Sequence, residues 1–89
     1  MRNFSVQGRE YAALIIDSDH DDFESMEVVR LHNGKRGELL LEFRLDQERT
    51  SLVYIGSTID IPLLRASIEV FWEEFMEPRK IAGLPLPPW

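Results

Sequence analysis

Three aspartates at alternate positions, Asp17, Asp19 and Asp21, have the spacing with which an EF-hand calcium loop begins. Such a loop needs a glycine at its sixth position, where the chain turns sharply, and a bidentate glutamate at its twelfth. This sequence has Asp22 and Val28 there. We therefore expect a solvated loop, with no metal and no cofactor, and keep a weak, non-specific divalent-ion site as the alternative.

The two histidines are the next candidates for chemistry: His20 lies in the acidic segment and His32 near the end of an expected strand. A catalytic histidine has to converge with a carboxylate or a nucleophile. The serines and threonines lie outside any Gly-x-Ser-x-Gly context, and the five glycines form no phosphate-binding loop. The chain has no cysteine to act as nucleophile or thiolate ligand. We predict that the protein is not an enzyme, and keep a metal-dependent hydrolase as a minor alternative.

An acidic ridge is expected on the helix near the C-terminus. It consists of Glu69, Glu73 and Glu77 at intervals of four residues, with Glu74 beside them. Like charges at this spacing destabilise a helix, and carboxylates near its C-terminal end also oppose the helix dipole. These costs favour a function for the ridge, the binding of a basic protein partner. The alternative is a solvated face on a protein that is acidic throughout.

Two tryptophans are candidate contacts for a partner, because tryptophan dominates binding hot spots. Trp72 follows Phe71, so the two rings point about 100° apart around the helix and one of them leaves the centre of the apolar stripe. Burial in the core is the competing interpretation for Trp72. Trp89 ends a proline-rich tail, residues 79–89, which folds back over the sheet, docks on a partner as polyproline II, or stays disordered.

Composition limits the class of protein. With 89 residues, 44% of them hydrophobic and 29% charged, the chain forms one small globular domain. Its net charge of −6 argues against nucleic acid as a partner. No apolar run approaches the roughly 20 residues that span a bilayer, and no signal-peptide block precedes the first strand. We expect a cytoplasmic protein that binds neither membrane nor nucleic acid.

The expected fold is α+β, an antiparallel meander with one C-terminal helix packed on one face. Strands are predicted at residues 4–6 with 11–16, 26–32, 38–45 and 50–55. Gly8 leaves open whether the first is one bulged strand, giving four strands, or two strands joined by a turn, giving five. Asn33-Gly34 indicates a hairpin, with Lys35 to Gly37 extending its loop.

The helix is predicted to begin after Asp60 as N-cap, with Pro62 in its first turn, and to end at Pro78. Residues 1–78 then form the domain. Alternation places Leu39 toward the core and Leu40 on the wet face. The expected core is Ile15, Val28, Leu39, Leu41, Phe43, Leu52, Tyr54, Leu64, Ile68, Phe71 and Phe75.

Two functions of different classes follow. The first is a stoichiometric inhibitor or immunity-type protein that binds a basic partner through Glu69, Glu73, Glu74, Glu77, Trp72 and Trp89. The second is a structural or assembly module that forms a homodimer or larger particle through a sheet edge or face. A single helix covers only one side of the sheet, so the other face needs the tail, a partner chain or polar solvation.

Overall fold

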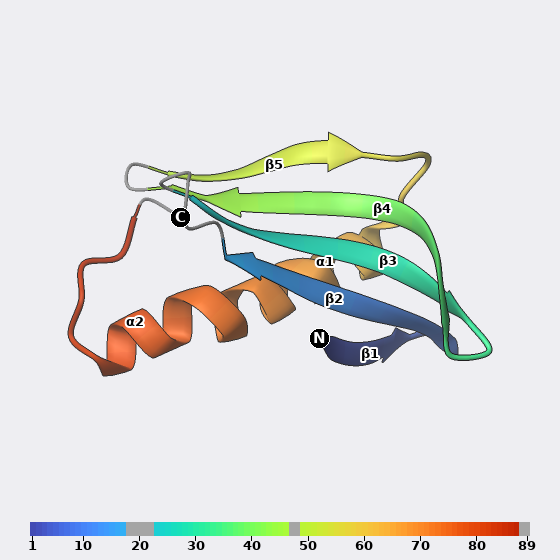
Figure 1. The fold of residues 1–89 in the computed structure, drawn as a ribbon, viewed down its shortest axis with the longest axis horizontal. Helices are drawn as coiled ribbons and strands as arrows, with labels where there is room; N and C mark the ends of the chain where they lie inside the picture. The colour runs from blue at the N-terminus through green and yellow to red at the C-terminus, as the bar shows by residue number, and fades with distance from the viewer. Residues whose placement is uncertain (18–22, 47–48, 88–89) are drawn as a thin grey trace.

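The computed structural model describes residues 1–17, 23–46 and 49–87. Five antiparallel strands form one sheet in the order of the sequence. They are β1 (Arg2–Val6), β2 (Arg9–Asp17), β3 (Glu24–His32), β4 (Lys35–Leu45) and β5 (Thr50–Ile55). A helix formed by α1 (Ile61–Phe71), η1 (Trp72–Met76) and α2 (Glu77–Ile81) packs against one face (Figure 1). The predicted α+β meander with a C-terminal helix is confirmed, in its five-stranded form.

Two tight turns build the hairpins at one end of the sheet. Gln7 and Gly8 have φ of 51° and 79°, and Asn33 and Gly34 have φ of 52° and 79°. Positive φ at both central residues is the requirement of a type I′ turn, whose twist matches the flanking strands. Gly8 therefore lies in a turn between two strands. The longer loop expected after Gly34 is absent, because β4 already begins at Lys35.

A register shift between β3 and β4 changes which leucine enters the core. Val28 pairs with Leu41 and Val29 with Leu39, so Leu40 is the extra residue of a β-bulge. Leu40 belongs to the main core and is 6% exposed, whereas Leu39 packs against a small cluster on the other face. The expectation that Leu39 faces the core and Leu40 faces water is therefore wrong. Strict alternation does not survive a bulge.

The helix begins as predicted and ends later than predicted. Asp60 is the N-cap, its carboxylate accepting a hydrogen bond from the backbone N–H of Leu63 at 2.9 Å, and proline occupies the first turn. The predicted end at Pro78 is wrong. A proline inside an α-helix lacks a donor and collides with the carbonyl four residues back. Here a π-helical turn, η1, precedes Pro78, which then falls in the first turn of α2, where no donor is needed.

A Schellman motif ends the helix three residues after the proline. Gly83, with φ of 72°, donates its N–H to the carbonyl of Lys80 at 3.1 Å. Leu84 donates to the carbonyl of Arg79 at 2.9 Å. The left-handed conformation that this motif requires suits glycine. The chain beyond Gly83 thus leaves the helix in a defined direction, and the side chains of Leu84 and Leu86 remain exposed.

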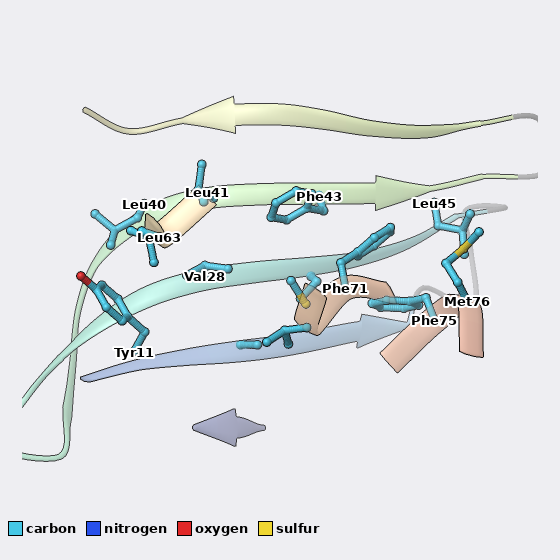
Figure 2. Packing of buried hydrophobic residues seen from close by; sticks show 13 residues of the cluster. Tyr11, Val28, Leu40, Leu41, Phe43, Leu45, Leu63, Phe71, Phe75 and Met76 are labelled. Atoms are coloured by element: carbon cyan, nitrogen blue, oxygen red, sulfur yellow. The ribbon is translucent and has the colours of Figure 1, made fainter. Parts of the chain in front are cut away.

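The main core lies between the helix and strands β2, β3 and β4 (Figure 2). Phe71 stacks on Phe43, with ring centroids 5.4 Å apart, and also contacts Phe75 at 4.8 Å. The buried members are Tyr11, Ala13, Met26, Val28, Leu40, Leu41, Phe43, Leu45, Leu63, Val70, Phe71, Phe75 and Met76. The predicted burial of Val28, Leu41, Phe43, Phe71 and Phe75 is confirmed.

Four predicted core residues are exposed: Ile15, Leu52, Tyr54 and Ile68. Ile15 lies on β2 beyond the last residue that pairs with β1. Leu52 and Tyr54 lie on β5, where none of the described side chains is buried. The helix stripe is directed at β2 to β4, so the β5 side of the sheet extends past it. The opposite face holds a small cluster formed by Ala12, Val29 and Leu31 with Leu14 and Leu39 packed against it.

Candidate protein-binding surface

Two glutamates of the predicted acidic ridge contact an arginine of β1. The guanidinium of Arg2 lies 2.5 Å from a carboxylate oxygen of Glu73 and 3.3 Å from one of Glu74. The hydrogen bonds to Glu73 and then to Glu74 raise the pKa of Arg2 above its usual value. The sequence separation of these groups exceeds 70 residues, so spacing along the helix gave no sign of the contact.

Trp72 and Glu77 contact each other. The indole Nε1 of Trp72 donates a hydrogen bond to Oε2 of Glu77 at 3.0 Å, and both side chains are partly buried. Glu69 is exposed on α1. Trp89 lies outside the described residues. Of the six predicted contact residues, four are thus engaged within the chain, and Glu69 is exposed on the surface of α1.

An exposed apolar surface lies along β5, which includes two of the predicted core residues, Leu52 and Tyr54. β5 is the last strand in the sheet order, so one of its edges pairs with β4 and the other is the rim of the sheet. Along it, Leu52, Val53, Tyr54 and Ile55 are all exposed, Val53 at 44% and Ile55 at 58%. Exposed apolar side chains in a contiguous patch mark interaction surfaces far more often than single ones do.

A groove of about 300 Å³ runs beside this strand on the helix side of the sheet. Its walls come from β4, β5 and α1, with Leu52 and Ile68 exposed on either side and Phe43 and Phe71 beneath. Thr50 and Ser51 supply polar atoms at one end. We name the β5 rim surface as Leu52, Val53, Tyr54, Ile55 and Ile68 together with this groove.

The sequence did contain a signal for the β5 rim surface. Residues 50–55, Thr-Ser-Leu-Val-Tyr-Ile, have strong strand preference and carry no charge and no proline. The other four strands each carry at least one charged residue. As the last strand of a meander, this segment is also the one expected at an edge. The prediction that Leu52 and Tyr54 of this segment lie in the core is wrong, because hydrophobicity alone does not distinguish a buried strand from an exposed edge strand.

Basic residues gather at one end of the sheet. The β1–β2 and β3–β4 turns share one end, where Arg9, Arg30, Lys35 and Arg36 lie among the residues of the strand ends, with Glu10 and Glu38 as counter-charges. The opposite end of the sheet holds Asp17, Glu24 and Asp46. Glu24 pairs directly with Asp17 and also accepts a hydrogen bond from Arg79 at 3.2 Å. The same end also holds Arg44, Arg49 and Arg79, so its described charges balance, and only the hairpin end has an excess of basic residues.

The predicted chemistry of the acidic loop is largely beyond what the structure describes. Asp19, His20, Asp21 and Asp22 lie outside the described residues. Within residues 1–17, 23–46 and 49–87, no three histidine, aspartate or glutamate side chains gather as metal ligands. His32 lies near Arg9 and Arg30 in a shallow polar depression at the hairpin end of the sheet.

In the same described part of the chain, no helix has the length and apolar character to cross a membrane. Comparison of the chain with models of protein families, with curated proteins and with solved structures finds no match.

Proposed function

We propose that the chain is a non-enzymatic protein-binding module whose partner docks on the β5 rim surface. The observation that supports this is the run of exposed apolar side chains along a terminal strand, with an apolar groove beside it. A strand laid against a sheet edge gains main-chain hydrogen bonds, and its alternate side chains fill neighbouring pockets. The groove between β5 and α1 offers such a pocket.

Edge strands of monomeric proteins are usually protected against pairing by charges, prolines or bulges. β5 has one of these devices, because the register shift opposite Glu42 and Phe43 makes Val53 a bulged residue. It has neither of the others. The residues on both sides of Val53 remain regular strand paired with β4, so their outer edge keeps the geometry that strand addition needs.

A photo-reactive amino acid placed at single positions tests this proposal in a lysate of the native cells. Incorporation at Ile55 is expected to cross-link a protein, including another copy of the chain. The matched control is Ile81, which is 80% exposed at the end of α2, an element that lies well away from β5 (Figure 1). Cross-linking from Ile81 as strong as that from Ile55, or none from Ile55, would refute the proposed surface.

A second candidate is the inhibitor-type protein that binds a basic partner through the acidic helix. The exposed position of Glu69 favours it, together with the net charge of −6. Against it, Glu73, Glu74 and Glu77 already have partners within the chain. The same experiment separates the two functions, since a basic partner of the helix is expected to cross-link from Glu69 and not from Ile55.

A further inference from the structure

We propose that the occupant of the β5 rim surface is a second copy of this chain, with the two β5 strands antiparallel about a two-fold axis. The inference rests on the proposed function, because it names the partner of the same surface. An isologous contact requires a patch that is complementary to itself. β5 meets this requirement because it has no charged residue, so that pairing with a copy brings no like charges into direct opposition.

The direction of the two-fold axis follows from the antiparallel pairing of the two β5 strands. Two copies of one edge strand that pair antiparallel are related by an axis perpendicular to the sheet, and such a rotation keeps both helices on the same face. The two grooves beside α1 then open toward the same seam. Ile68 and Leu52 of each copy line that seam, so the apolar walls that face water in one chain face each other in the pair.

The excess of basic residues at the hairpin end of the sheet favours the same arrangement. An antiparallel pair places the two hairpin ends, each with Lys35 and Arg36, at opposite ends of the combined sheet and so keeps these basic residues apart. A parallel side-by-side pair would align like ends. Because the whole chain carries −6, two copies repel at long range. Added salt screens this repulsion and is therefore expected to strengthen the association.

The area that the contact buries indicates a weak interface. A seam of two six-residue strands with their apolar side chains buries on the order of 1,000 Å² in total, the lower limit for a specific interface. We therefore infer a reversible dimer in equilibrium with monomer. Sedimentation velocity of the full-length chain over a hundredfold concentration range is expected to show the sedimentation coefficient rising from that of a monomer to that of a dimer.

The first variant pair is Ile55→Lys and Ile81→Lys, which change the same residue type and the same charge at two exposed positions. In the dimer both copies carry the Ile55→Lys change, which places two ammonium groups at the seam. We expect Ile55→Lys to weaken dimerisation by at least about tenfold. Ile81→Lys is expected to change the dimerisation constant by less than about twofold, because it adds a surface charge away from the contact.

Single cysteines provide the second and independent test, because the chain has none of its own. Cysteine is placed in turn at Leu52, Val53, Tyr54 and Ile55 under mild oxidation. In an antiparallel two-fold pair, the distance between the same residue in the two copies grows by about 7 Å for each step from the axis. A disulfide needs Cα atoms within about 7 Å. The yield of disulfide dimer is therefore expected to peak at one position and fall on either side.

Three results would overturn the second copy as occupant: a sedimentation coefficient that stays monomeric over the whole range, equal disulfide yields at all four positions, or equal effects of Ile55→Lys and Ile81→Lys. Failure here is distinguishable from failure of the proposed function. A monomeric chain that still cross-links a different protein from Ile55 has a binding surface at β5 and another partner. A chain that cross-links nothing from Ile55 has neither.

Discussion

Trp72 and Glu77 are joined twice across five residues of the helix. The backbone N–H of Glu77 donates to the carbonyl of Trp72, the hydrogen bond that defines the π-helical turn. The indole of Trp72 donates to the carboxylate of Glu77 at 3.0 Å. A separation of five residues brings two side chains together in a π turn, whereas an α-helix favours three or four. The contact between Trp72 and Glu77 therefore stabilises the π-helical turn, after which the helix continues through Pro78.

Removing the indole donor tests this role. Trp72→Phe keeps an aromatic ring and leaves Glu77 without its indole partner, and we expect it to lower the free energy of unfolding by about 0.5–1.5 kcal/mol. Glu77→Gln keeps an acceptor oxygen and is expected to cost less. Urea unfolding followed by circular dichroism measures both. A larger loss in Glu77→Gln than in Trp72→Phe would contradict the assignment.

The bulge in β4 predicts opposite behaviour for two adjacent leucines. Leu40→Ala removes a side chain from the main core and is expected to cost about 2–5 kcal/mol. Leu39→Ala affects a partly buried residue beside the small cluster on the other face, and is expected to cost clearly less. Chemical denaturation of the two variants decides the register. Equal costs, or a larger cost for Leu39→Ala, would show that the strand keeps the strict alternation.

Gly56 holds the end of β5 against β4. Its N–H donates to the carbonyl of Leu40 at 2.8 Å, and a Cβ added there would lie 2.5 Å from the carbonyl oxygen of Leu39. That clash is with backbone, so Gly56→Ala has to displace the end of the strand. We expect a loss of about 1–3 kcal/mol in stability and faster hydrogen exchange at the end of β5. Ser57→Ala, at the exposed next position, is the control and should behave as wild type.

The N-cap of the helix gives a graded prediction. Asp60→Ala removes the acceptor for the N–H of Leu63, and is expected to cost about 0.5–2 kcal/mol. Asp60→Asn keeps a capping oxygen without the charge and should retain most of the stability. Thermal unfolding of both variants measures the difference. If asparagine is as damaging as alanine, the contribution of Asp60 is its charge near the helix N-terminus and not the hydrogen bond.

Arg2 offers a test of the acidic helix. Arg2→Gln releases Glu73 and Glu74 and makes the net charge more negative, at a stability cost below about 1 kcal/mol because the pair is exposed. If the helix binds a basic protein, its association rate should rise in this variant. If the partner docks on β5, the rate should not rise, and stopped-flow or biosensor kinetics with that partner distinguishes the two.

The contact of Arg2 with Glu73 and Glu74 also predicts how the stability of the protein depends on pH. The pKa of Arg2 is raised in the folded protein, so its contribution to stability is fully present below the ordinary pKa of arginine and is lost only as the pH rises through the raised value. The guanidinium therefore stays charged throughout the physiological range. Stability measured across that range should show no step that Arg2→Gln removes.

Local sequence signals predicted most elements of the fold, but the longer loop expected after Gly34 and the helix end expected at Pro78 are wrong. Asp60 and Pro62 predicted the start of the helix because capping depends on neighbours in the chain, and Asn33-Gly34 predicted the hairpin for the same reason. The end of the helix failed because Pro78 breaks only an α-helical turn. Whether a π turn precedes it depends on packing and on the Trp72–Glu77 contact, neither of which a propensity contains.

The candidate site could be predicted from the sequence less well than the fold. Whether Leu52 faces a helix or water depends on where the helix axis lies over the sheet, which is a property of tertiary packing. The pairing of Arg2 with Glu73 likewise joins the two ends of the sequence. Such errors are informative, because apolar residues that lie at the exposed edge of a sheet are the ones available to a partner.

The strict pairing of each strand with its neighbour in sequence has a kinetic consequence. Hairpins closed by two-residue turns form contacts between residues close along the chain, so little loop entropy is lost before each pair of strands is made. A five-stranded sheet of this kind can assemble by adding one strand at a time, beginning at either tight turn. We therefore expect refolding in milliseconds, fast for a protein built mainly of β-sheet, with β5 among the last strands to be secured.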